Sequence, residues 1–145
     1  MQDKEFSMKH RVASFIIGFF WTLTAVAAGH DYKCVIERVS SASGDSGNSH
    51  QFYVDNYVGR EFSVDRVSGV MAGALKNSYV TKPEVIDFGS SENSYKVIAT
   101  MRVDQGAGAG SSVYALTIEE FGSDNEKPFV FLMNATVFFG KCEHF

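Results

Sequence analysis

The sequence predicts an all-β domain, an antiparallel meander of about eight strands that forms a small closed barrel or a flattened sandwich. Two observations support this fold class. From residue 31 onward, short segments rich in β-branched and aromatic residues alternate with segments rich in Gly, Ser, Asn and Asp. The two cysteines, Cys34 and Cys142, stand near the two ends of this region. A disulfide would bring the terminal strands together, which favours a closed barrel.

The first 28 residues have the three parts of a signal peptide. Residues 8–11 are basic, residues 12–28 form a nearly continuous apolar run, and small residues suited to a signal peptidase end that run. We expect residues 1–28 to be a cleaved leader, with Met8 as an alternative start, and residues 29–145 to form a single domain. A retained anchor is the alternative, because the run is at the lower end of the roughly 17–25 residues that span a bilayer. We expect no membrane span after cleavage.

Export makes a disulfide the expected state of Cys34 and Cys142, because exported compartments are oxidising. A free pair and a metal-binding pair are the alternatives, and the sequence offers no CxxC motif in support of a metal. Across so long a loop, the bridge would disfavour the unfolded chain by roughly 4–5 kcal/mol in the chain-entropy model.

The first half of the domain is expected to contain four strands. In chain order these are residues 31–40, 51–58, 60–66 and 70–75. In the first strand the alternation places Tyr32, Cys34, Ile36 and Arg38 on one face. Residues 41–49 are predicted to form a polar loop. Residues 65–69 have the chemistry of a tight hairpin loop, because Gly69 can adopt a positive φ. A short helix over residues 70–77 is the alternative to the fourth strand.

The second half is also expected to contain four strands, over residues 84–88, 94–103, 113–121 and 128–142. In the second of these, Tyr95, Val97, Ala99 and Met101 alternate onto one face. Residues 105–111 form a flexible glycine-rich loop. The long last strand is apolar on both faces, so we expect it to be central in the sheet or covered by another layer.

Composition excludes two classes of partner. The net charge is −4 and the Lys and Arg residues are scattered, which leaves no basic footprint for nucleic acid and no basic patch for anionic lipid.

Four short motifs have structural rather than catalytic explanations. Residues 44–47 (GDSG) match the sequence around a serine protease nucleophile, but the histidine motif of that family is missing. The glycine loop at 105–111 precedes a strand, whereas phosphate-binding loops precede a helix. Glu119 and Glu120 point to opposite faces of a strand, so they are not a catalytic pair. Asn134 begins a glycosylation sequon, which falls inside the predicted last strand and is interpreted as a chance match.

His30 is the candidate metal ligand. Cleavage after Ala27 would make it the third residue of the mature chain, where an amine, two amide nitrogens and an imidazole form a square-planar set suited to Cu(II) or Ni(II). Cleavage after Gly29 would make it the first residue, with His50 or His144 needed as a further ligand. The alternative is a frayed terminus whose histidine binds nothing.

The predicted function is an exported, non-catalytic binding or interaction domain, with a protein partner or small ligand in the cell envelope. The alternatives are an assembly subunit of an envelope complex and a copper-binding protein. Phe138, Phe145 and Leu132 are the candidate apolar partner surface. Residues 32–34 and 139–142 are similar to the ends of small periplasmic β-proteins of bacteria, so the location is expected to be periplasmic or extracellular. Several apolar residues are expected either to fill the core or to line a ligand cavity: Phe62, Val64, Phe88, Tyr95, Phe129, Phe131 and Phe139.

Overall fold

A computed structural model describes residues 30–78, 81–106, 108, 110–122 and 124–145. The predicted leader therefore lies outside the described residues. In the described part the chain forms eight strands, one α-helix and one short 3₁₀ turn. The strands are β1 (Tyr32–Ser41), β2 (Glu61–Val64), β3 (Met71–Gly73), β4 (Glu84–Phe88), β5 (Tyr95–Met101), β6 (Ser112–Ile118), β7 (Lys127–Met133) and β8 (Thr136–His144). The helix is α1 (Gly47–Tyr57) and the turn is η1 (Val103–Gln105). Among these residues no helix is long and apolar enough to cross a bilayer.

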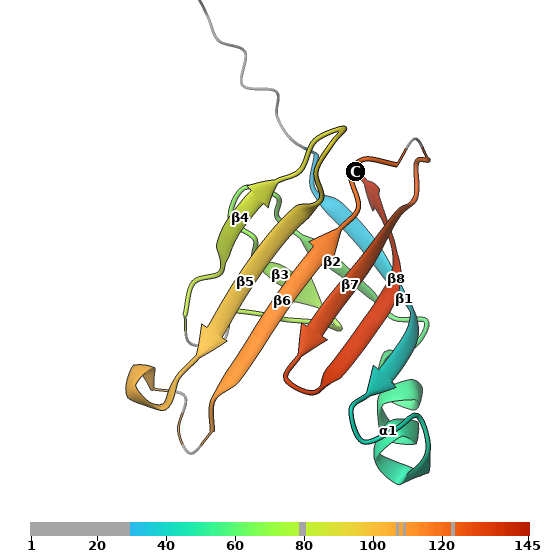
Figure 1. Ribbon diagram of the computed structural model, residues 1–145, viewed down its shortest axis with the longest axis vertical. Coiled ribbons are helices and arrows are strands. Elements are labelled where there is room, and N and C mark those ends of the chain that lie inside the picture. The colour runs from blue at the N-terminus through green and yellow to red at the C-terminus, as the bar shows by residue number, and fades with distance from the viewer. Residues whose placement is uncertain (1–29, 79–80, 107, 109, 123) are drawn as a thin grey trace, which may run out of the picture.

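The strands form one antiparallel sheet in the order β3-β2-β1-β8-β7-β6-β5-β4, which confirms the predicted all-β class (Figure 1). The first and last strands pair in the middle of the sheet, and the chain builds outward from them on both sides. The sheet curls into a half-barrel. Within the described residues the ladder does not close, because β3 and β4 each pair on one side only.

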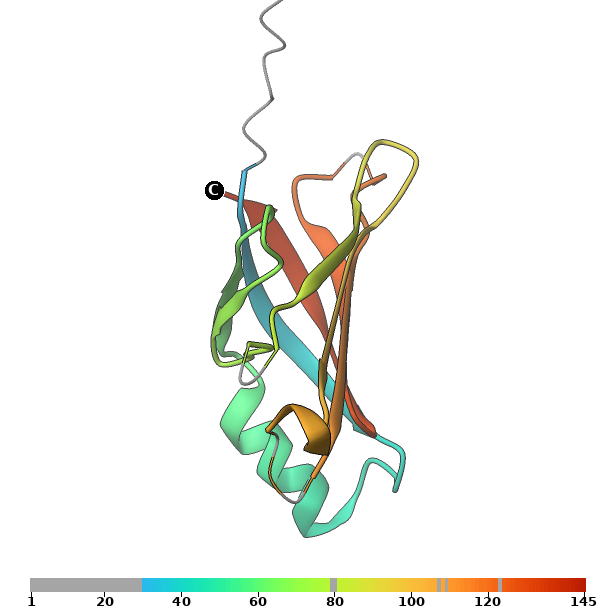
Figure 2. The same ribbon diagram turned by 90° about the vertical axis from the view of Figure 1, so that its left-hand side faces the viewer.

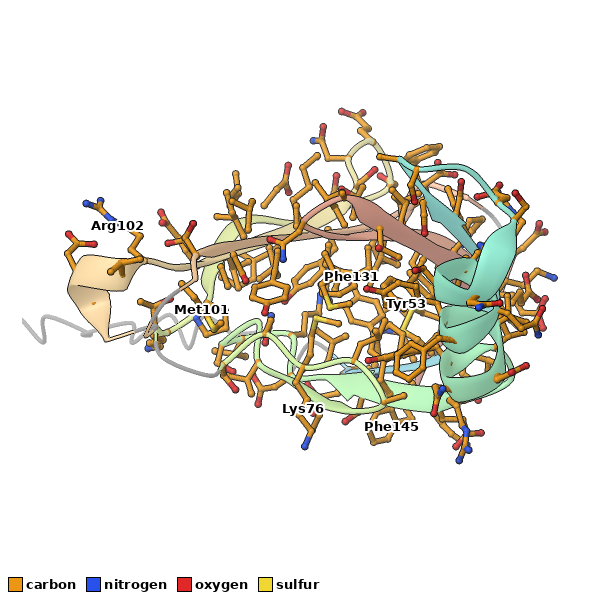
Figure 3. All side chains as sticks on the ribbon, turned by 90° about the horizontal axis from the view of Figure 1, so that it is seen from below. Tyr53, Lys76, Met101, Arg102, Phe131 and Phe145 are labelled. Atoms are coloured by element: carbon orange, nitrogen blue, oxygen red, sulfur yellow. A yellow bond between two sulfur atoms is a disulfide. The ribbon has the colours of Figure 1, made fainter. Side chains whose placement is uncertain are left out.

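The curl places β1, β2 and β3 opposite β4, β5 and β6 (Figure 2). Buried side chains fill the space between these two layers (Figure 3). Figure 3 shows Phe131 and Tyr53 pointing into this space. Aromatic rings pack there at centroid distances of 5–6 Å, as in the pairs Phe62–Phe129 at 5.1 Å and Tyr114–Phe131 at 6.1 Å. The predicted inward face of β5 is confirmed for Tyr95, Val97 and Ala99. Of the predicted core or cavity residues, Phe62, Val64, Tyr95, Phe129 and Phe131 are buried, whereas Phe88 is exposed.

The disulfide between Cys34 and Cys142 is confirmed. The two residues lie directly opposite each other on β1 and β8, with Cα atoms 3.9 Å apart, and both side chains are buried. The bridge therefore joins neighbouring strands at the centre of the sheet and not the two edges of a closed barrel.

A β-bulge in β1 corrects one predicted face. The register with β8 shifts between Ile36 and Arg38, so the alternation reverses there. Arg38 is exposed, with its guanidinium 3.8 Å from the ring centroid of Phe139, and Val39 is buried instead.

Helix α1 replaces the predicted strand at 51–58, so that prediction is wrong. It also takes the last three residues of the predicted loop at 41–49, of which residues 42–46 remain a turn. The decisive contacts are tertiary. Tyr53 and Tyr57, one helical turn apart, pack on Phe138 with ring centroids 6.1 and 5.1 Å away. A hydrogen bond of 2.7 Å from Gln51 to Asp55 adds a second pair at helical spacing.

The predicted long last strand is a hairpin, β7 and β8, joined by a turn at Asn134 and Ala135. Asn134 has φ 54°, a left-handed conformation that asparagine tolerates better than most residues. The turn changes which residues face inward, because Met133 pairs with Thr136. Phe138 and Cys142 therefore point into the core. The sequon lies in this exposed turn and not inside a strand.

The predicted hairpin loop at 65–69 is confirmed. Asp65 N donates to Val70 O at 2.9 Å, Gly69 N donates to Asp65 O at 2.8 Å, and Gly69 has φ 72°. The return strand β3 forms in place of the alternative helix, over Met71–Gly73 only.

Candidate functional site

One end of the half-barrel gathers the first and last described residues and several loops. Here β1, β3, β5 and β7 begin and β2, β4, β6 and β8 end, as the antiparallel order requires (Figure 1). We call it the cluster end, and we call the opposite end, where α1 and η1 lie, the helix end. The cluster end brings together side chains from segments far apart in the sequence.

The centre of the cluster end is Glu120, just after β6, whose side chain is only 8% exposed. Its Oε1 accepts a hydrogen bond from the Tyr32 hydroxyl. Nε2 of His144 lies 3.0 Å from Oε1 and 3.2 Å from Oε2, and Nη2 of Arg66 lies 4.0 Å from Oε1. These four residues, Tyr32, Arg66, Glu120 and His144, are the Glu120 cluster. They join β1, the β2–β3 turn, the end of β6 and β8.

The backbone packs closely around Glu120. The β4–β5 turn begins at Gly89, which has φ 72°, and a Cβ there would lie 2.6 Å from Cγ of Glu120. A side chain at position 89 would therefore displace the carboxylate from its partners. Lys127 reaches the same region from β7 and donates to the carbonyl oxygens of Glu120 and Gly122.

Two tyrosines of this region are held in the neutral form. Burial raises the pKa of Tyr32 well above its ordinary value, and the hydrogen bond to Glu120 and the charge of Glu120 raise it further. Burial also raises the pKa of Tyr95, with a smaller contribution from the charge of Asp65. The Tyr95 hydroxyl donates to Arg66 O at 3.1 Å. The ring centroids of Tyr32 and Tyr95 lie 5.1 Å apart.

His144 faces an acceptor on each side of its ring. Nδ1 lies 3.2 Å from the carbonyl oxygen of His30, and Nε2 faces the Glu120 carboxylate. Because both partners are acceptors, both nitrogens donate at once only when the ring is doubly protonated. In that form His144 pairs with Glu120 by charge as well as by a hydrogen bond.

Arg66 links the two edges of the sheet where the ladder stays open. Its Nη2 donates to Phe88 O at 2.6 Å, and its Nε donates to the same oxygen at 3.2 Å. Its backbone N donates to Oδ1 of Asp31 at 3.0 Å. The β2–β3 turn is thus fastened to the end of β4 by a side chain in place of a strand ladder.

The chemistry of this cluster favours a structural role for its buried groups. A histidine paired with a carboxylate is a common arrangement for a general base. Here, however, the Tyr32 hydroxyl is bonded to that same carboxylate and stays protonated, and both His144 nitrogens already have partners. The groups are therefore arranged to satisfy one another and to fix the positions of the surrounding loops.

Four large apolar side chains are exposed at the cluster end. Val67, Phe88, Phe121 and Phe145 are 74, 54, 51 and 64% exposed. Three of them directly follow a cluster residue, namely Arg66, Glu120 and His144. The fourth, Phe88, provides the carbonyl that Arg66 binds. We call these four residues the apolar rim.

The predicted partner surface is only partly present. Phe145 is exposed and belongs to the rim, whereas Leu132 is half-buried on β7. Phe138 is completely buried, so it is not part of a solvent-facing surface, because the β7–β8 hairpin turns it inward.

The expectation that Glu119 and Glu120 face opposite ways is met, since Glu119 is exposed and the side chain of Glu120 is almost inaccessible to solvent. The role of Glu120 was not predicted. Its signal is the alternation of β6, in which Tyr114, Leu116 and Ile118 are buried, continued by one step.

His30 is exposed, and its ring centroid lies 6.2 Å from that of His144. His50 is on α1 at the helix end, where Nδ1 is 3.9 Å from Oδ1 of Asp45. In the version of the predicted copper site that begins at Ala28, the backbone amine belongs to a residue outside the described part. Within that part, no group of three His, Cys, Asp or Glu side chains is arranged to hold a metal ion.

The GDSG segment lies in the turn that precedes α1, where Ser46 is the N-cap residue. Asp45 accepts hydrogen bonds from Ser41 N at 3.0 Å and from the Ser40 hydroxyl at 3.1 Å, and these bonds lower its pKa. The aspartate therefore stabilises this turn.

No protein-family model matches the sequence, and the comparisons with curated proteins and with solved structures likewise gave no match. The functional argument therefore depends on the geometry of the cluster end.

Proposed function

We propose that this chain is an exported, non-catalytic binding domain that contacts its partner in the cell envelope through the apolar rim. The supporting observation is that the four exposed side chains stand at one end of the molecule, each adjacent or bonded to the Glu120 cluster. Several large exposed apolar side chains at one end of a folded domain favour an interaction site there. The Cys34–Cys142 disulfide is consistent with an oxidising, exported location.

The buried cluster gives the rim a property that binding surfaces need. A polar network inside a protein is costly unless its members satisfy one another, and then it makes the surrounding structure rigid. Rim residues attached to such a network lose little conformational freedom on binding, which lowers the entropic cost of association. The cluster is accordingly a support for the apolar rim.

The test compares capture by matched variants of the full chain. We expect Phe88→Ser combined with Phe121→Ser to lose a partner that the wild-type chain captures from an envelope extract. Val103→Ser combined with Phe52→Ser removes exposed apolar side chains from the helix end and should retain that partner. The measurement is quantitative mass spectrometry of the captured proteins. A partner that both variants retain equally would contradict the proposal, and a complex that remains stoichiometric through purification would favour an assembly subunit.

A further inference from the structure

Two depressions lie on the surface of the molecule, and one of them is lined by Glu120 and His144, the residues that precede Phe121 and Phe145 of the apolar rim. One, of about 430 Å³, is lined by Glu120, Asp124, Asn125, Lys127, Glu143 and His144. The other, of about 310 Å³, extends along β1, β2 and β8. Glu143 belongs to both, so the two depressions form one surface that extends to the cluster end.

This surface has more carboxylates than cations. Its acidic residues are Glu37, Glu61, Glu120, Asp124, Glu126 and Glu143, and its lysines are Lys33, Lys127 and Lys141. Each lysine is already engaged. Lys33 pairs with Glu61 at 3.2 Å, Lys141 pairs with Glu126 at 2.8 Å, and Lys127 bonds to backbone carbonyls.

Three carboxylates are left without an ion pair among the described residues, namely Glu37, Asp124 and Glu143. Two of them, Glu37 and Asp124, interact by charge with Lys141. The pKa of Lys141 is raised first by its hydrogen bond and charge interaction with Glu126, with further contributions from Glu37 and Asp124. The acidic groups therefore lie around Lys141, on the surface that reaches Glu120 and His144 at the cluster end.

We propose that the apolar rim and this acidic surface form one docking site for a basic protein, whose Lys or Arg side chains flank an apolar group. The inference rests on the proposed binding function and adds the chemistry of the partner. Charge complementarity decides the choice of occupant. A second copy that docked through this same face, or an anionic lipid surface, would place like charges against Glu37, Asp124 and Glu143. Arginine beside apolar groups is also a frequent source of binding energy at protein interfaces.

The probe is a fluorescein-labelled short peptide of alternating arginine and leucine, titrated with the full chain by fluorescence anisotropy. We expect a peptide of alternating arginine and serine to bind about tenfold more weakly than this probe. A peptide of alternating glutamate and leucine should bind more weakly than either. Phe121→Ser should weaken binding about tenfold, whereas Val103→Ser at the helix end should not change it.

The carboxylates are tested through salt dependence. Asp124→Asn combined with Glu143→Gln should lower both the affinity and its dependence on ionic strength, because exposed charges are screened by salt. Glu84→Gln, an exposed carboxylate at the helix end, should change neither.

Three results would overturn the inference. They are equal binding of the arginine–leucine and glutamate–leucine peptides, equal losses from Phe121→Ser and Val103→Ser, and rim-dependent binding of phosphatidylcholine vesicles without peptide binding. If capture from the extract depends on the rim while the basic peptide does not bind preferentially, the binding function stands and the basic partner is wrong. If capture is also independent of the rim, both proposals fail.

Discussion

At the scale of single residues, Glu120 and its neighbour Glu119 have the same chemistry and opposite surroundings. Because successive residues of an extended chain point to opposite faces, Glu119 is exposed to solvent and Glu120 lies among Tyr32, His144 and Arg66. Burying a carboxylate is costly, and the cost is offset only when hydrogen bonds and charges surround it. The pair therefore separates the effect of the buried charge from the effect of the residue type.

We expect Glu120→Gln to lower the free energy of unfolding by about 2–3 kcal/mol, because hydrogen bonds to a charged group are lost while the volume is kept. Glu119→Gln should change it by no more than about 0.5 kcal/mol. Urea unfolding at neutral pH followed by circular dichroism measures both. Equal small effects would mean that the buried carboxylate contributes nothing to stability.

The raised pKa values of Tyr32 and Tyr95 predict a loss of stability in alkali. Because an unfolded phenol has a pKa of about 10 and folding raises that pKa, the contribution is fully present below about pH 10 and is lost as the pH rises further. Each phenol should contribute a slope of about 1.4 kcal/mol per pH unit. We expect Tyr32→Phe combined with Tyr95→Phe to flatten this slope in urea unfolding between about pH 10 and 12. A double variant with the wild-type slope would contradict the assignment.

At the scale of elements, the two edges of the sheet are protected in different ways. The outer edge of β4 has its last carbonyl, that of Phe88, bonded to Arg66. The outer edge of β3 is covered by the buried side chain of Asn77, whose amide accepts from Met71 N at 2.9 Å and donates to Gly69 O at 2.8 Å. An open edge offers backbone groups to other chains, and both contacts reduce that exposure.

Asn77→Ala should lower the free energy of unfolding by about 2–3 kcal/mol, because two backbone groups lose their partner in a buried position. Asn77→Asp keeps the acceptor for Met71 N and removes only the donor to Gly69 O. Hydrogen exchange at the Met71 amide distinguishes them, since it should become faster in the alanine variant alone. Unchanged exchange in the alanine variant would contradict this role of Asn77.

The elements also show what the sequence can and cannot predict. Strands with regular alternation, such as β5, and the glycine turn at 65–69 were predicted because their signals are local. Helix α1 was missed because its decisive contacts are tertiary, from Tyr53 and Tyr57 to Phe138. The β7–β8 turn was missed because Asn134 and Ala135 lack the glycine of the commonest hairpin turns. The Glu120 cluster was missed because its members are distant in sequence.

At the scale of the whole molecule, the disulfide has a different position from the one that a closed barrel implies. It joins β1 to β8 at the centre of the sheet, and the open side of the half-barrel lies between β3 and β4. That side is joined at the cluster end by Arg66, with Gly69 packed against Val97. The cluster end therefore combines two functions, since the residues that join the two edges also position the apolar rim.

This arrangement predicts separate effects for the bridge and the cluster. Cys34→Ala combined with Cys142→Ala should lower the free energy of unfolding by roughly 4–5 kcal/mol, chiefly by giving the unfolded chain more freedom. Because β1 and β8 keep their full backbone pairing, the folded variant should retain its far-ultraviolet circular dichroism and its rim-dependent partner binding.

Arg66→Gln should have the opposite pattern, with a large loss of partner binding and a small change in the free energy of unfolding. The reason is that the substitution releases the end of β4 and with it Phe88. Urea unfolding and quantitative capture on the same samples compare the two. A cysteine variant that folds but loses the partner would mean that the bridge, and not Arg66, determines the geometry of the rim.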